Sequence, residues 1–450
     1  MRENRIRAFD AVAATAAVLL LTAGSAALRA ATAPDSDSSS SSPPGVAAWL
    51  EGDAPQAALD LASRTDREGA LNRAVALLYA GDAVAAEREL AALRAREPRW
   101  TPALRWLARA RAEDGSPALE ETLQALLADR DADSRDFLWV GRLRLDAGEP
   151  GRARASLAEA VAREKDLYLG WLWLGDAEEA LGRTAPARDA WLRARALHAG
   201  CDVLARLGES PPPPLPADLA PPLRPGEKLS YSAKYLFFRF ASVEIENLGF
   251  TELHGRRVAR VVFSVRSNPG FPLLKIDSRF ESFIAEDGSV LAHRSSSRDS
   301  TQARRAAAYD MDPATGRCVV RQVVEGLFGF DRFPLAPLAQ DGVSVLQLAR
   351  GLAGSPAHLS VLTAVDSSWK GTELRTVGPE KIRWAGRDVE AVKVEAIGHY
   401  EGPAGLSGRL LTWISRDGRA IPYKASIKVA LGSVVLSLRD EAPQTRQAAR

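Results

Sequence analysis

Ser367 and Lys370 stand three residues apart, in the Ser-x-x-Lys pattern that acyl-enzyme hydrolases use for a serine nucleophile and its lysine partner. Such a mechanism also needs the partner motifs of those enzymes, and they are absent from this chain. A match of four residues arises easily by chance. We therefore interpret Ser367 and Lys370 as residues without a catalytic role.

Asp310 and Asp312 are two residues apart, so their carboxylates would share one face of a strand and offer a cation two ligands. Pro313, Thr315 and Gly316 follow them, which is more typical of a turn capped by aspartate side chains. We find no metal-ligand spacing among the histidines and no phosphate-binding glycine loop. The histidines are His198, His254, His293, His358 and His399. We expect no metal, no cofactor and no enzymatic activity.

A repeat in the first half of the chain predicts the elements of that half. Gly148 and Gly182 lie 34 residues apart, and several small or large apolar pairs share that period. Such a period predicts stacked helical hairpins, here at 67–98, 101–132, 135–166 and 169–200. Gly148 and Gly182 should lie in the turns between helices, where a left-handed backbone is easily reached. The other pairs are Gly141 and Gly175, Ala153 and Ala187, Leu157 and Trp191, and Ala160 and Ala194.

These residues resemble the tetratricopeptide repeat (TPR), most closely in the last two copies. The resemblance covers about 130 residues and implies antiparallel helix pairs in a right-handed superhelix. It also implies a concave face that binds peptides or protein segments. Seven of the ten tryptophans fall between Trp49 and Trp191, and most should form the core between helices. We expect Trp106 or Trp139 to line the groove for a protein partner.

A proline-rich stretch separates the two halves. Eight prolines fall within 211–225, and Pro211–Pro214 should form a polyproline II strut, so we assign 201–225 to a linker. From Gly226 the apolar period becomes two, and Gly342–Leu352 is the only helical pattern. About ten antiparallel strands with one helix should close or curl. The clearest strand patterns are Leu229–Ala241, Arg257–Ser267, Arg317–Val324, Asp388–Ile397, Arg409–Ser415 and Ile421–Leu431.

Three stretches of the second half resemble a bacterial envelope family known as domain of unknown function 3108. They are Pro225-Gly226-Glu227-Lys228-Leu229-Ser230-Tyr231, Asp341-Gly342-Val343-Ser344-Val345-Leu346, and Trp413-Ile414-Ser415-Arg416-Asp417 with Ile421-Pro422. The family is similar to the half-barrel group that includes the lipoprotein carrier LolA. This resemblance implies a curved antiparallel sheet around one or a few helices, with a concave apolar side that holds acyl chains. It implies no catalytic residues.

Aromatic side chains in the strand patterns are candidates for lining such a cavity. We select Phe237, Phe240, Trp384 and Trp413 as the ligand-binding residues for an acyl chain or lipid. A barrel of this size either holds one small ligand or fills itself with side chains. The alternative to a lipid site is therefore an ordinary filled core.

The charge balance and the cysteine count argue against nucleic-acid binding and against a disulfide or metal framework. The chain has 59 basic and 57 acidic residues, a net charge of +2, which argues against a nucleic-acid partner. Its two cysteines, Cys201 and Cys318, cannot build a disulfide framework or a metal cluster.

The N-terminal 28 residues have the pattern of an export segment. Arg2, Arg5 and Arg7 precede an uncharged stretch at 11–28, so residues 1–28 are either a signal peptide or a membrane anchor. Residues 29–45 are rich in serine and proline and should form a disordered linker. Together with the resemblance to a bacterial envelope family, these features predict a protein of the periplasm, free or anchored in the inner membrane.

The sequence thus predicts a multidomain α+β protein. A TPR-like superhelix occupies 46–200, an antiparallel β half-barrel occupies 226–440, and a disordered tail follows at 441–450. The leading hypothesis is a non-enzymatic protein of the cell envelope that binds a protein partner and packs on or carries an apolar ligand. The alternatives are an envelope hydrolase or glycan-modifying enzyme with a TPR adaptor, and a purely structural scaffold.

Overall fold

The computed structural model describes residues 44–198, 201–210, 219, 221–235, 238–268, 276–298, 304–336, 338–355, 357–365, 368–402, 406–429 and 432–439. Several predictions fall outside these residues. They are the export segment at 1–28, nearly all of the serine-rich linker, the strut at Pro211–Pro214, Phe237, Ser367 and the C-terminal tail.

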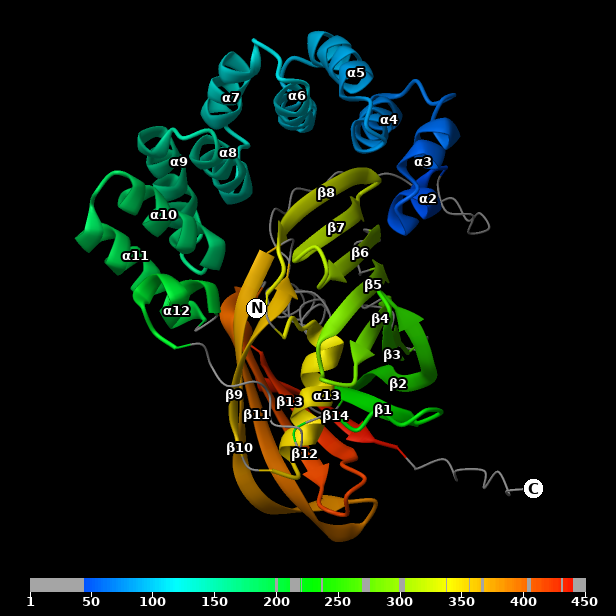
Figure 1. The fold of residues 1–450 in the computed structure, drawn as a ribbon. Helices are drawn as coiled ribbons and strands as arrows, with labels where there is room; N and C mark the ends of the chain where they lie inside the picture. Colours follow the sequence, from blue (N-terminus) through cyan, green and yellow to red (C-terminus); the bar gives the residue numbers. More distant parts are fainter. Residues whose placement is uncertain are drawn as a thin grey trace, which may run out of the picture.

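The first part of the chain is an arc of paired helices, the helical array (Figure 1). Its hairpins coincide with the predicted repeats, which confirms the TPR arrangement. A short pair precedes them. The helices are α2 (Val46–Glu51), α3 (Ala54–Asp60), α4 (Arg67–Tyr79), α5 (Ala83–Arg96), α6 (Thr101–Asp114), α7 (Leu119–Ala128), α8 (Ser134–Asp146), α9 (Pro150–Arg163), α10 (Tyr168–Ala180), α11 (Thr184–Leu197) and α12 (Cys201–Leu207).

Small residues let the helices of one hairpin cross closely. A Cβ atom added to Gly141 would lie 2.6 Å from the Leu157 side chain, and one added to Gly175 would lie 2.2 Å from the Trp191 ring. The residues after α8 and α10 that turn the chain, Gly148 and Gly182, have φ angles of 74° and 73°. The period therefore has the physical cause that the sequence predicted.

The linker prediction for 201–225 is wrong at its start. Residues Cys201–Leu207 form α12, because Val203 and Leu204 bury their side chains against the apolar surface of the last hairpin. This helix covers the end of the array. In the described part of the chain, none of the helices has the length and hydropathy needed to span a bilayer.

The second part is one antiparallel sheet that is not closed, the curved sheet. The order of its described strands is β8-β7-β6-β5-β4-β3-β2-β1-β14-β13-β12-β11-β10-β9. The strands are β1 (Lys228–Tyr235), β2 (Phe238–Leu253), β3 (Arg256–Ser267), β4 (Asp277–Ala285), β5 (Val290–Arg298), β6 (Arg304–Asp312), β7 (Arg317–Val324), β8 (Leu327–Pro334), β9 (His358–Val365), β10 (Ser368–Trp384), β11 (Arg387–Gly402), β12 (Leu406–Ser415), β13 (Pro422–Val429) and β14 (Gly432–Leu438).

The predicted number of about ten strands is too low. The run Leu229–Ala241 is two strands, since β1 ends at Tyr235 and β2 begins at Phe238. Strand β10 escaped detection because it contains Gly378 and Pro379 and many charged residues, and therefore lacks an apolar alternation.

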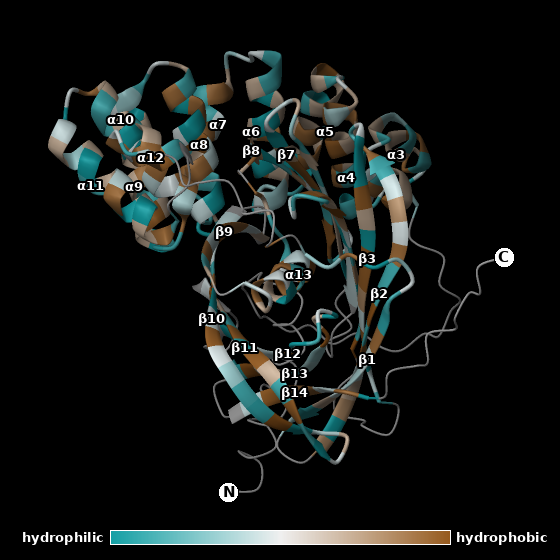
Figure 2. Cartoon of the chain, turned by 60° about the horizontal axis from the view of Figure 1, so that its bottom comes forward, coloured by the Kyte–Doolittle hydropathy of each residue, from teal (hydrophilic) through white to brown (hydrophobic). Residues whose placement is uncertain are grey.

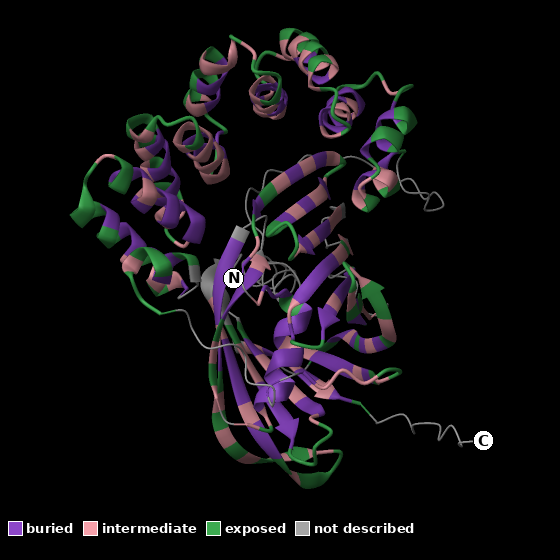
Figure 3. Ribbon diagram, in the orientation of Figure 1, coloured by how far each residue is buried: buried purple, intermediate pink, exposed green. Residues whose placement is uncertain are grey.

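The predicted helix Gly342–Leu352 is present as α13 and lies inside the curve of the sheet (Figures 1 and 3). Its Leu348 and Leu352 pack with Val394 and Ile414 of the sheet in one apolar cluster. Hydropathy along the strands changes from residue to residue, as expected for a sheet with one covered face (Figure 2).

The two ends of the strand order approach each other at one corner of the sheet. The Trp369 ring donates its Nε1–H to the Pro334 carbonyl at 2.7 Å, and it meets the Phe333 ring edge-on at 5.2 Å. The sheet thus curls until the end of β8 meets the start of β10, and the helical array arches over this side (Figure 1).

Candidate functional site

One stripe of residues runs along the inner helices of the array. Asn72, Trp106, Trp139 and Trp173 are 34, 33 and 34 residues apart, so they occupy the same position in α4, α6, α8 and α10. These helices form the inner side of the arc, facing the sheet (Figure 1). The first part of this inner surface contacts β7 and β8, a region we call the first dock.

In the first dock, side chains of the array bind the outer edge of β8. Strand β8 pairs with β7 alone among the described strands, which leaves its other edge without a strand partner. The Asn72 amide donates to the Gly326 carbonyl at 2.6 Å and accepts from the Phe328 N–H at 2.8 Å. The Arg109 guanidinium donates to the Phe330 carbonyl at 2.5 Å. The array therefore satisfies backbone groups that an unprotected edge would offer to another chain.

Aromatic rings fill the same dock. Phe328 stacks on Trp49 with centroids 4.9 Å apart, and Phe330 stacks on Tyr79 at 3.6 Å. Trp106 meets Tyr79 edge-on at 6.0 Å. Burial in this cluster raises the pKa of Tyr79 to about 12, so its hydroxyl stays neutral. Both phenylalanines lie on one side of β8, because side chains alternate along a strand.

Arg109 carries the charge of the first dock. Its guanidinium forms an ion pair with Asp331 of β8 at 3.1 Å and lies over the rings of Trp106 and Trp139, at 4.8 and 5.5 Å. The Arg109 side chain is only 12% exposed, so a buried cation would remain without Asp331. This contact favours an acidic group at that point of the strand.

A second dock lies at the other end of the array, against β9 and β10. Lys370 of β10 donates to Glu164 at 2.5 Å and to Asp166 at 2.9 Å, both in the turn before α10. The Lys370 side chain is 6% exposed. Burial alone would raise the pKa of Glu164, but Lys370 and Ser134 together hold that pKa below its ordinary value. Glu164 is therefore a carboxylate at neutral pH.

His198 belongs to the second dock as well. Its Nδ1 atom lies 3.4 Å from the Ser360 hydroxyl of β9, and its ring meets Tyr168 edge-on. Burial lowers the pKa of His198 to about 4, so the imidazole is neutral at neutral pH.

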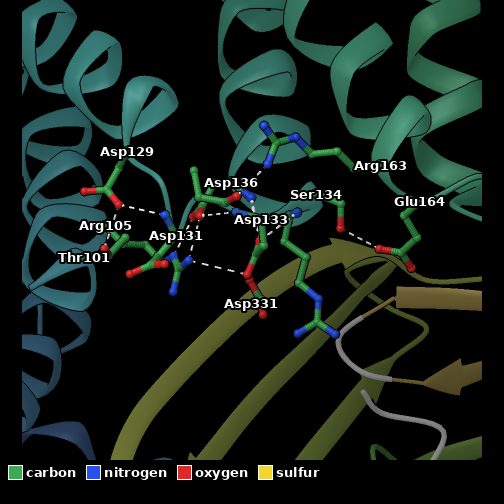
Figure 4. A network of polar contacts seen from close by, with 12 residues as sticks. Thr101, Arg105, Asp129, Asp131, Asp133, Ser134, Asp136, Arg163, Glu164 and Asp331 are labelled. Atoms are coloured by element: carbon green, nitrogen blue, oxygen red, sulfur yellow. Dashed lines mark hydrogen bonds and ion pairs between the residues drawn. The ribbon is translucent and has the colours of Figure 1, made fainter. Parts of the chain in front are cut away.

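Polar contacts between successive repeats fix the inner surface between the two docks (Figure 4). Arg105 of α6 forms a bidentate pair with the buried Asp136 of α8, at 2.5 and 2.6 Å. Ser134 donates to Glu164 at 2.5 Å, which connects α8 to the second dock. Such charge-assisted contacts give the arc a defined spacing.

The two residues predicted to line the partner groove both lie on the inner stripe. Trp106 is buried against Tyr79, and Trp139 is partly exposed beside Arg109. The structure thus places them at or next to the first dock. Their role in binding a partner stays a prediction.

The predicted ligand-binding aromatics lie in different parts of the sheet. Phe240 is buried beside a bulge between β1 and β2. Trp384 lies at the tip of the β10–β11 hairpin and donates to the Leu438 carbonyl at 3.2 Å. Trp413 is on the face opposite α13, under Lys393 and Lys424. These three residues do not share the concave side that was expected of a lipid site, and lipid binding stays a prediction.

The candidate catalytic residues have separate structural partners. Lys370 is bound to Glu164 and Asp166 in the second dock. Asp310 contacts the ring of His254 at 2.8 Å, and Asp312 accepts from the Ala314 N–H at 2.9 Å, as expected of a turn cap. Among the described residues, no group of three or more His, Cys, Asp or Glu side chains is placed to hold a metal. Absence of catalysis stays a prediction.

One polar cluster inside the sheet was not foreseen. Ser282 and His293 both contact the same carboxylate oxygen of Asp341, with His293 Nδ1 at 2.8 Å. The carboxylate lies between serine and histidine, whereas general-base activation of serine needs the imidazole in the middle. The other Asp341 oxygen accepts from the N–H groups of Val343 and Ser344, at 2.8 and 2.7 Å. The cluster therefore caps α13.

The opposite end of α13 has its own anchor. The buried Arg350 forms a bidentate pair with Glu227, at 2.6 and 2.8 Å, and donates to the Ala420 carbonyl at 2.9 Å. Tyr231 donates to the Pro422 carbonyl at 2.9 Å. The three stretches that carried the family resemblance thus meet around α13, where Glu227 and Asp341 anchor its two ends and Ile414 packs against it.

Comparison with known proteins addresses the two halves separately. Residues 230–439 match the family model described as "Protein of unknown function (DUF3108)", which confirms the resemblance of the second half. Part of the chain is similar to a crystal structure of MamA, with 18% identity over 34% of this chain and 92% of MamA, at a TM-score of 0.31. Another MamA structure gives 16% identity over 38% and 94%, at 0.31. TTC0263, described as a thermophilic TPR protein in Thermus thermophilus, gives 21% over 36% and 93%, at 0.29. No curated protein matches the chain.

Proposed function

We propose that the chain is a non-enzymatic binding protein whose helical array holds an extended segment of a protein partner. The supporting observation is the first dock, where the inner surface of the array binds a strand edge. Asn72 and Arg109 bond the backbone, and Trp49 and Tyr79 stack on the side chains of the strand. Backbone bonds with pockets for alternate side chains are a general mode of peptide recognition.

The test is site-specific photo-crosslinking of the full chain in a cell that produces it. A photoreactive residue replaces Trp139, beside the first dock, or Val84, which is 64% exposed on the outer helix α5. We expect a discrete protein adduct from position 139 and none from position 84. Equal labelling from both positions, or none from position 139, would contradict the proposal.

Export to the bacterial envelope is part of the proposal and is supported by residues 1–28 alone. A fusion of residues 1–45 to a reporter that is active only outside the cytoplasm should be active. Replacing Leu20 by Arg within the apolar stretch should abolish this activity. A fusion that stays in the cytoplasm would remove the envelope assignment.

Carriage of an acyl chain is a second candidate function. It is favoured by the apolar residues on the α13 side of the sheet, among them Val265, Phe280 and Leu436. These side chains are already buried, which favours the scaffold alternative with a filled interior. Mass spectrometry of organic extracts from natively purified protein decides between them. Stoichiometric lipid supports carriage, and its absence together with no binding of a fluorescent fatty acid excludes it.

A further inference from the structure

Strand β8 occupies the inner surface of the array as a bound peptide would. It runs from α4 to α6, since Phe328 contacts Asn72 and Phe330 contacts Arg109. The two phenylalanines are two residues apart and stack on rings of the array, while Asp331 pairs with Arg109. The dock therefore has a defined pattern, which is aromatic, small, aromatic, acidic. The second place is small because a Cβ atom added to Gly329 would lie 2.7 Å from the Gln322 side chain.

We propose that the partner binds at the first dock itself, in exchange for β8, through an extended segment with this pattern. The inference rests on the proposed function and names the site and the chemistry of the occupant. An extended backbone is required because Asn72 accepts from the Phe328 N–H and Arg109 donates to the Phe330 carbonyl, two residues further along the same edge of β8. Two aromatic rings at alternate positions are required because they fill the places beside Trp49 and Tyr79.

Charge adds a further requirement. Of the carboxylates near Arg109, Asp136 is held in a bidentate pair by Arg105 and is buried, whereas Asp331 comes from the exchangeable strand. A segment with a neutral or basic residue at that place would leave the Arg109 cation without a counter-charge. The site thus selects an acidic segment.

Exchange of strand β8 would break its pairing with one described strand of the sheet. The strand lies at the edge, bonds β7 alone among the described strands, and leaves β7 through the two-residue turn Glu325-Gly326. While attached, it competes at an effective concentration on the order of millimolar. Weak ligands therefore do not displace β8 from the first dock, whereas a partner that binds there more tightly than β8 does.

The experiment uses the full chain and a fluorescent peptide with the sequence of residues 325–335. The double variant Phe328→Ala/Phe330→Ala weakens the internal occupant and keeps every residue of the array. It should bind the peptide at least about tenfold more tightly than the wild-type chain does. Peptides with both phenylalanines replaced by alanine, or with Asp331 replaced by lysine, are the matched controls and should lose binding. Equal affinity of the wild type and the variant, or binding of the control peptides, would overturn the inference.

A second measurement covers the case in which the double variant does not fold. Excess peptide added to the wild-type chain should increase hydrogen exchange in 317–334 and leave α4 and α6 protected. Unchanged exchange at millimolar peptide would contradict strand exchange. If crosslinking from position 139 still succeeds, the proposed function survives and only the identity of the site and its occupant fails.

Discussion

The helical array holds the curved sheet at two places, and the two docks use different physical interactions. The first dock combines stacked rings with backbone hydrogen bonds to Asn72 and Arg109. In the second dock the lysine Lys370 contacts two carboxylates, each about one third exposed. Apolar contact depends little on salt and pH, whereas a partly exposed ion pair depends on both. Solution conditions should therefore act more strongly on the second dock than on the first, where the Arg109–Asp331 ion pair is one contact among several.

The largest expected effect comes from the aromatic core of the first dock. Phe330→Ala should lower the free energy of unfolding by about 3–5 kcal/mol, because it removes the ring stacked on Tyr79 and leaves a cavity. Chemical denaturation measures the loss, and hydrogen exchange should rise in 67–79 and 317–334. Phe238→Ala is the control, since that ring is 39% exposed. Equal losses in both variants would mean that the first dock contributes no more than surface packing.

Removing the backbone contact should have the next largest effect. Asn72→Ala leaves the Gly326 carbonyl and the Phe328 N–H without their partner, which should lower stability by about 1–3 kcal/mol. The exchange rate of the Phe328 amide should increase with it. The control is Gln124→Ala, whose exposed amide bonds only Glu120 on its own helix. An unchanged Phe328 amide in the Asn72 variant would show that this bond does not protect the strand edge.

The ionic dock should be weaker. Lys370→Met keeps most of the side-chain volume but leaves Glu164 and Asp166 facing each other, which should lower stability by about 1–2 kcal/mol after allowance for their exposure. High salt should weaken the wild-type contact and have less effect on the variant. Lys381→Met, at an exposed pair with Glu390, is the control. Similar salt dependence in wild type and Lys370→Met would contradict an ionic dock.

Mild acid should have the smallest effect, and only on the second dock. The pKa of Glu164 is lowered in the fold, so its contribution is present above the ordinary carboxylate pKa and disappears as the pH falls through the folded value. The pKa of His198 is lowered to about 4, so between pH 6.5 and about 4 the unfolded chain binds more protons and stability falls. The protection of backbone amides, measured relative to the intrinsic exchange rate at each pH, should be lower at pH 5 than at pH 7 in 168–180 and equal in 67–79. A uniform loss of protection would contradict the difference between the docks.

Local sequence patterns account for the elements of this fold but not for the docks. The 34-residue period predicted the hairpins because Gly141 and Gly175 contact residues only 16 positions further along the chain. The first dock joins residues more than 250 positions apart, and no local pattern encodes such a pair. One sequence feature does indicate this contact, because Asn72 occupies the position that tryptophan occupies in the next three repeats. An amide there breaks an apolar pattern and indicates a polar contact.

The predicted aromatic site failed to assemble for a related reason. Trp413 and Ile414 are neighbours in β12, so they face opposite sides of the sheet, and only the register of β11 and β12 decides which of them meets α13. Phe240 lies beside a bulge, which shifts the alternation that the sequence suggested. Polar residues such as Glu227, Arg350 and Asp341 belong to separate stretches, and only the fold shows that they anchor one helix.

The order of synthesis gives the first dock a consequence in time. Arg109 and Phe330 are separated by 221 residues, so at a ribosomal rate of about 5–20 residues per second the array side of the first dock is complete roughly 11–44 s before its strand exists. During that interval the rings of Trp49 and Tyr79 have no internal cover. The nascent chain therefore exposes an aromatic surface before β8 is synthesised. The yield of folded protein should depend on what shields that surface until residue 330 leaves the ribosome.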